Sequence, residues 1–249
     1  MDNPLDGINE KLKRTHECIG NLQSDISLFF QGGKHPIRGD EDFQTARTAV
    51  SYYHENPTMP LRFSVLVGEI IHHFRSCLDH IAWQLSDADS RRDRPTRIEF
   101  PVFRDAPRDK NEAARYNRKV EGIRSIAALK LIGDLQPYNR PKPLDDPIWI
   151  IHDMDSIDKH RELVIVALGF HFTVPPHLLE LARRYTTDDL GPIPPDVARQ
   201  FQQYGKFSPD IAFRQFGERE HQPVVPSLLD LENFIRSVVA SFEGELLKC

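Results

Sequence analysis

Leu61–Ser86 reads LRFSVLVGEIIHHFRSCLDHIAWQLS, and we expect the remaining elements of the chain to pack around this segment. Its apolar residues recur at steps of three and four, a spacing that places them along one stripe of an α-helix. Val65 and Trp83 fall on the opposite side of the same helix. A helix with apolar residues on two sides is predicted to be central and buried from several directions. The stripe consists of Phe63, Val67, Ile70, Phe74, Cys77, Ile81 and Leu85.

Helices are also predicted on both sides of this segment. The apolar residues of 5–29 keep the same helical spacing, and Gly32-Gly33 ends that helix. The apolar seam of 5–29 suits either packing within the bundle or pairing with a second copy of the chain. A helix over 146–160 starts with an aspartate cap followed by proline. The last helix opens at Ser227 and Asp230, which form a near capping box.

Three shorter segments have the composition of β-strands. These are 43–54, with threonine, valine and tyrosine, 163–174, with strictly alternating apolar residues, and 211–216. Two helical pieces, 109–119 and 123–132, and a short helix at 178–185 are expected between the longer elements, whereas 87–97 is predicted to be a charged loop. The sequence thus predicts one α+β domain over residues 1–249, mainly helical, with a bundle of about four long helices and a small antiparallel sheet.

Composition narrows the class of protein. The chain has 249 residues, of which 39% are hydrophobic and 28% charged, and its net charge is −5. These values are typical of a soluble globular protein without a basic surface for duplex DNA. The longest apolar run, 163–170, is too short to cross a membrane, and the first residues do not resemble a signal peptide, so we expect a cytoplasmic protein. The three cysteines lack CxxC spacing and are expected to be free thiols.

Two segments carry unusually many polar side chains for elements that face a core. They are 71–80, IHHFRSCLDH, and 151–161, IHDMDSIDKHR. Arg75 and Asp79 are four residues apart on one helix and can form an ion pair. Buried charges are costly unless they are paired, so we expect the second segment to supply further partners in a shared, buried polar cluster. The residues expected to join Arg75 and Asp79 in this cluster are Asp155, Asp158, His160 and Arg161.

The same segments suggest a metal site as a further hypothesis. His73, Cys77 and His80 share one flank of the helix, His152 belongs to the second segment, and imidazole and thiolate groups are suitable ligands for zinc. The backbones of His73 and His80, however, are separated by about 10 Å along the helix axis. The structural alternative is that these histidines are partly buried and bonded to their neighbours. The sequence does not identify any cofactor.

The segment Arg75-Ser76-Cys77-Leu78-Asp79-His80 resembles the Arg-x4–6-His signature of HEPN domains, a family of helical proteins that includes metal-independent endoribonucleases. That resemblance implies an RNA substrate, with Arg75 stabilising the phosphate and His80 acting in acid-base catalysis. More broadly, the RSCLDH, FPVF, LQPY and DKHR segments, in that order over residues 61–170, resemble a group of bacterial proteins without an assigned function.

Three functions are therefore compared. The leading hypothesis is a non-catalytic intracellular interaction or ligand-binding protein, self-associating, in which the polar cluster fixes the packing of the central helix. The second is a HEPN-like endoribonuclease, and the third is a metal-dependent enzyme or metal sensor. RNA is an expected partner only for the second, and no membrane partner is expected for any of them.

Overall fold

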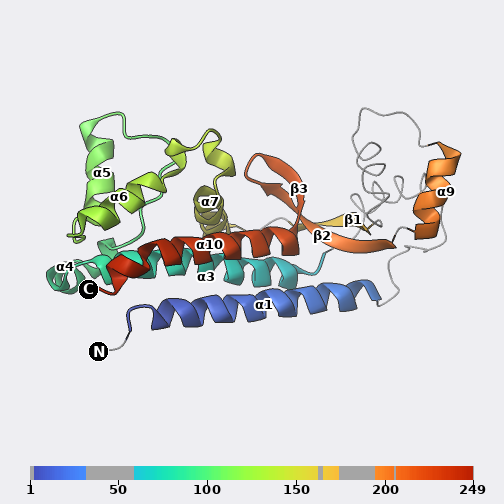
Figure 1. The fold of residues 1–249 in the computed structure, drawn as a ribbon, viewed down its shortest axis with the longest axis horizontal. Helices are drawn as coiled ribbons and strands as arrows, with labels where there is room; N and C mark the ends of the chain where they lie inside the picture. Colours follow the sequence, from blue (N-terminus) through green and yellow to red (C-terminus); the bar gives the residue numbers. More distant parts are fainter. Residues whose placement is uncertain (1–2, 32–58, 162–164, 174–193, 205, 249) are drawn as a thin grey trace.

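The computed structural model describes residues 3–31, 59–161, 165–173, 194–204 and 206–248. Three long helices lie side by side, namely α1 (Asp6–Gln31), α3 (Leu61–Leu85) and α10 (Val224–Leu246) (Figure 1). The helix α3 contacts α1, α10 and α7 (Pro147–His160). The predicted central position of 61–86 is therefore confirmed, as is the mainly helical α+β fold.

The core is built largely on α3. Every residue of its predicted apolar stripe is buried, and Ile71, Leu78 and Ala82 on a second side are buried as well. This second buried side exists because α3 is packed against three other helices. Val65 does not belong to it: 58% of Val65 is exposed, so the sequence-based expectation for this residue was wrong.

The apolar seam of α1 packs within the chain. Ile8, Leu12, Ile19 and Leu22 are between 0% and 2% exposed, and α1 contacts both α3 and α10. A buried carboxylate joins this interface, because Glu232 of α10 accepts hydrogen bonds from His16 and Arg236. Of the two arrangements that the spacing allowed, packing inside the bundle is the one observed.

Shorter helices follow α3 along the chain. The region predicted as a charged loop contains α4 (Ala88–Asp93) and the 3₁₀ turn η1 (Pro95–Arg97), which corrects the prediction. The cause is local: the side chain of Asp87 accepts the Ser90 N–H and caps α4. The remaining short elements are α5 (Lys110–Val120), α6 (Ile126–Asp134), η2 (Pro137–Asn139) and η3 (Pro143–Asp145), and α5 and α6 lie over one end of the bundle (Figure 1).

An antiparallel sheet lies at the other end of the bundle (Figure 1). Its strands β1 (Ile165–Thr173), β2 (Lys206–Phe216) and β3 (Arg219–Pro223) have the order β1-β2-β3. The helix α9 (Pro195–Tyr204) precedes β2. The strand predicted over 163–174 is confirmed, that predicted over 211–216 begins earlier, and β3 was not predicted. The predicted strand 43–54 and helix 178–185 lie outside the described residues.

The start of the C-terminal helix also differs from the prediction. It begins at Val224 with Pro223 in the capping position, so neither Ser227 nor Asp230 caps it. Ser227 and Asp230 instead project from the body of the helix, where they line a pocket described below. Among the helices that the structure describes, none combines the length and the apolar character needed to cross a bilayer.

Candidate functional site

Arg75 fastens the central helix to the segment that follows α4 and η1. It is 4% exposed, and its Nη2 donates hydrogen bonds to Asp79 Oδ1 at 2.7 Å and to the Phe100 carbonyl oxygen at 2.8 Å. Asp79 Oδ1 also accepts the Phe100 N–H at 2.9 Å. We call Arg75, Asp79 and Phe100 the connector clamp. It holds the segment 98–103, which we call the connector, against α3 through both the N–H and the carbonyl oxygen of Phe100.

Other charged groups surround the connector clamp. Glu99 lies 3.7 Å from Arg75 Nη2 and also pairs with Lys119 of α5. Burial, together with the nearby charges of Arg75 and Lys119, lowers the pKa of His152 from 6.5 to about 4. The His152 imidazole is therefore neutral at pH 7. Arg75 Nη1 is buried without a hydrogen-bond partner among the described residues.

Gln136 also holds this segment, although its sequence context predicts only a turn. Its side chain is fully buried; Nε2 donates to the Pro101 and Ile132 carbonyl oxygens at 2.9 and 3.0 Å. Its Oε1 accepts the Phe103 N–H at 3.1 Å. A glutamine that follows a helix is usually exposed, so the sequence contained no signal for this role.

A second polar group joins α7 to α3. Asp155 is buried, accepts a hydrogen bond from His72 Nδ1 at 3.0 Å and pairs with Lys159 at 2.6 Å. The Asp158 carboxylate packs against the backbone of α3 and fills the space that a Cβ at Gly68 would need. Burial and the neighbouring Asp155 raise the pKa of Asp158 above its ordinary value.

The single buried cluster expected from the two segments is thus divided, which corrects the prediction. Arg75 and Asp79 bind the connector, whereas Asp155 and Asp158 pack against an earlier part of α3. His160 and Arg161 are exposed and belong to neither group. The reason is geometric: they stand at the last turn and C-cap of α7, beyond its packed part.

The predicted metal ligands are not brought together. A Cβ at Gly7 of α1 would contact the His80 ring, whereas His152 lies near Arg75. Burial raises the pKa of the Cys77 thiol to about 12, so it remains protonated, and burial lowers the pKa values of His73 and His80. No group of three or more histidine, cysteine or acidic side chains in the described part of the chain is arranged to hold a metal.

The geometry also does not favour a nuclease site at Arg75 and His80. Arg75 is buried under the connector with Nη2 bonded to Asp79 and Phe100, and His80 lies beside α1. In this chain the guanidinium is not exposed to receive a phosphate.

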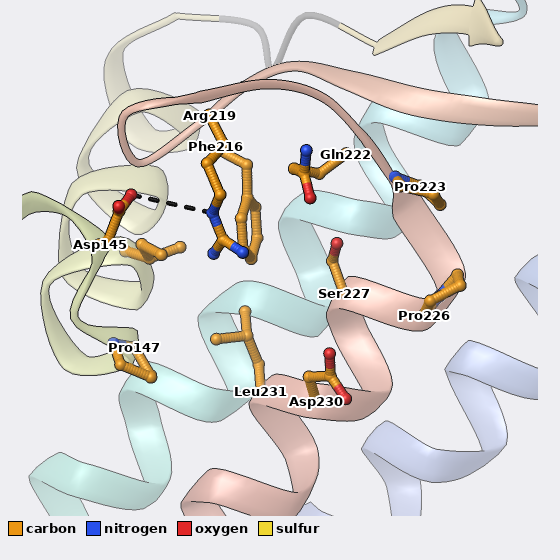
Figure 2. Close-up of a pocket in the computed structure, with 11 residues that line it drawn as sticks. Asp145, Pro147, Phe216, Arg219, Gln222, Pro223, Pro226, Ser227, Asp230 and Leu231 are labelled. Carbon is orange, nitrogen blue, oxygen red and sulfur yellow. Dashed lines mark ion pairs between the residues drawn. The ribbon is translucent and has the colours of Figure 1, made fainter. Parts of the chain in front are cut away.

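A pocket of about 170 Å³ lies where η3, the first turns of α7 and α10 and the β2–β3 hairpin meet (Figure 2). Its apolar walls come from Pro147, Ile150, Phe216, Pro223, Pro226 and Leu231. Its polar side chains are Asp145, Arg219, Gln222, Ser227 and Asp230.

Local contacts fix Arg219 at the edge of this pocket. Its guanidinium lies over the Phe216 ring, with Cζ 5.4 Å from the ring centre, and its Nε is 3.8 Å from Asp145 Oδ1. Asp145 also accepts the Glu218 N–H at 2.9 Å, which joins η3 to the hairpin. Gly217 forms the turn with a φ of 65°, where a Cβ would clash with Asp145.

Nothing in the sequence indicated this pocket, because its lining comes from two stretches, 145–150 and 216–231, that lie far apart along the chain. Comparison with models of known protein families, with curated proteins and with solved structures finds no match to the chain.

Proposed function

We propose that this chain is a non-catalytic ligand-binding protein whose ligand occupies the pocket between the β2–β3 hairpin and α10. The observation that carries the proposal is a space of about 170 Å³ with apolar walls and several polar side chains. Small-molecule sites have this mixed lining. A cavity of about 150 Å³ holds benzene, so a ligand of roughly six to ten non-hydrogen atoms fits here.

The chemistry of the lining supports binding rather than catalysis. None of the described residues that line the pocket is a histidine, cysteine or lysine. The Ser227 hydroxyl therefore has no imidazole or amine beside it among these residues to act as the base that would make it a nucleophile. The clusters outside the pocket have structural partners: Arg75 is bonded to the connector, and Asp155 to His72 and Lys159.

The second polar group supports the pocket indirectly. One end of α7 contributes Pro147 and Ile150 to the pocket wall, and Asp155 lies further along the same helix. Its contacts with His72 attach α7 to α3, which also packs against α10. The pocket wall is therefore fixed by contacts of α7 with the bundle, a feature that lowers the cost of ordering a binding site.

A cytoplasmic location and self-association remain hypotheses. The seam of α1 is covered by α3 and α10, so a second copy of the chain would have to bind through another surface.

The test is a screen of small fragments of about six to ten non-hydrogen atoms by saturation-transfer NMR with the full chain. Gln222→Trp places a bulky ring in the pocket, and Gln215→Trp, at an exposed position on β2 outside it, is the matched control. We expect fragments that bind the wild type and the control and lose binding to Gln222→Trp. Asp230→Phe is a second blocking variant if Gln222→Trp does not fold. The proposal is refuted if no fragment that binds the wild type and the control loses binding to the blocking variant that folds.

A further inference from the structure

The polar side chains around the pocket have hydrogen-bonding capacity that the protein does not use. Within the described part of the chain, the two terminal nitrogens of Arg219 have no hydrogen bond, and Gln222 uses only Nε2, which donates to the Glu220 carbonyl oxygen at 3.0 Å. The Ser227 hydroxyl and the Asp230 carboxylate have no hydrogen bond there either. In Figure 2 the Gln222 oxygen and the Ser227 hydroxyl point toward each other, and the Arg219 guanidinium lies beside the Phe216 ring, on the side of Asp145.

The groups without hydrogen bonds include one cation and several acceptors. Beside the turn of the hairpin, the Arg219 guanidinium offers paired N–H donors. Toward α10, three groups accept hydrogen bonds: the Gln222 oxygen, near the end of β3, and the Ser227 hydroxyl and Asp230 carboxylate of α10. The apolar lining of the same pocket includes Phe216 and Leu231. A complementary ligand therefore has an anionic acceptor at one end, a cationic donor at the other and an apolar part between them.

We infer that the pocket binds a small amino acid, with its carboxylate on Arg219 and its ammonium group toward Asp230, Ser227 and Gln222. The inference rests on the proposed function and names the ligand class for the same pocket. A guanidinium pairs with a carboxylate through two parallel hydrogen bonds, which sets the orientation of the ligand.

The charge of the pocket separates an amino acid from a simple anion. Arg219 contributes one positive charge, and Asp145 and Asp230 each contribute one negative charge, so the lining has a formal charge of −1. A phosphate or a plain carboxylate would bring more negative charge to this site and be repelled by both aspartates. An amino acid is neutral overall and meets an opposite charge at each end.

The experiment is isothermal titration calorimetry of the full chain with a panel of α- and ω-amino acids of up to about ten non-hydrogen atoms. For leucine, 4-methylpentanoate lacks the ammonium group and 3-methylbutylamine lacks the carboxylate, so these compounds are the matched controls. Inorganic phosphate is the third control. We expect at least one amino acid to bind about tenfold or more tightly than its two truncated analogues and phosphate, because each end makes a charge-assisted hydrogen bond.

Variants then assign the two ends of the ligand. Arg219→Gln is expected to weaken amino acid binding about tenfold or more, and Asp230→Asn is expected to weaken amino acid binding but not that of the carboxylic acid. Arg214→Gln on β2 and Glu243→Gln on α10 make the same charge changes at exposed positions outside the pocket and are expected to have no effect.

The outcomes separate this inference from the proposed function. If fragments bind in the pocket but amino acids bind no better than their truncated analogues, the amino acid inference is overturned and the binding function stands. Preferential binding of phosphate would have the same consequence. If nothing binds to the wild type in a way that Gln222→Trp abolishes, both are overturned.

Discussion

Replacing Asp79 with alanine removes two of the three hydrogen bonds of the connector clamp. Arg75 loses its bond to Asp79 Oδ1 at 2.7 Å, and the Phe100 N–H loses its acceptor at 2.9 Å. The guanidinium, which is 4% exposed, keeps the Phe100 carbonyl oxygen and the more distant Glu99. The variant therefore leaves a buried charge and a backbone donor with fewer partners.

The size of the effect follows from these contacts. Removing one partner of a buried ion pair costs about 3 to 5 kcal/mol, and an unsatisfied N–H adds about 1 kcal/mol. The Asp79 side chain is 35% exposed, so water partly replaces the carboxylate and reduces the loss. Burial raises the pKa of Asp79 above its ordinary value, against the lowering effect of Arg75 and the Phe100 N–H. We expect a net destabilisation of about 2 to 4 kcal/mol, or a decrease in Tm of roughly 5 to 15 °C for a chain of this length.

The assay is thermal and urea unfolding followed by circular dichroism. Asp89→Ala is the matched control, because Asp89 is 79% exposed and pairs with Arg92 on the surface, where such pairs contribute about 0 to 1 kcal/mol. The double variant Arg75→Met, Asp79→Leu removes both charges and should regain part of the lost stability. A Tm for Asp79→Ala within about 2 °C of the wild type would refute the reasoning, since it would mean that the connector clamp contributes little.

Three further predictions concern the histidines and the thiol. The pKa of His152 is about 4 in the folded chain and has its ordinary value of 6.5 in the unfolded chain. Between these pH values the unfolded chain binds more protons than the folded chain. The contribution of neutral His152 to the free energy of unfolding is therefore present above pH 6.5 and is lost as the pH falls toward 4. The wild type should thus lose more Tm than His152→Gln between pH 7 and pH 4, and parallel profiles would contradict this. Burial raises the Cys77 pKa to about 12, so iodoacetamide should not modify Cys77 in the folded chain at about pH 8 but should do so in urea, as read by mass spectrometry of peptides. Rapid modification of Cys77 in the folded chain would show that its thiol is not buried. Finally, because Arg75 is buried, the chain should not cleave single-stranded RNA in EDTA; cleavage abolished by His80→Ala at unchanged Tm would restore the nuclease hypothesis.

Much of the helical framework follows from local sequence spacing. The apolar steps of three and four in 5–29 and 61–86 predicted α1 and α3 closely, and the Asp146-Pro147 start predicted α7. The ion pair between Arg75 and Asp79 was also predicted from the sequence, because its partners are four residues apart on one helix. In each case the residues that determine the structure are within a few positions of one another, so the sequence by itself determined these features.

Features that depend on distant partners were decided only by the tertiary structure. The strand β3, Arg219–Pro223, has no apolar alternation and becomes a strand by pairing with β2 through the turn at Gly217. The exposure of His160 and Arg161 depends on where the packing of α7 ends. The role of Gln136 depends on the course of the connector, and the pocket forms only when η3, the hairpin and α10 meet. Helical periodicity reports which side of an element is apolar, but the identity of the group that faces each polar side chain is set by contacts between distant segments.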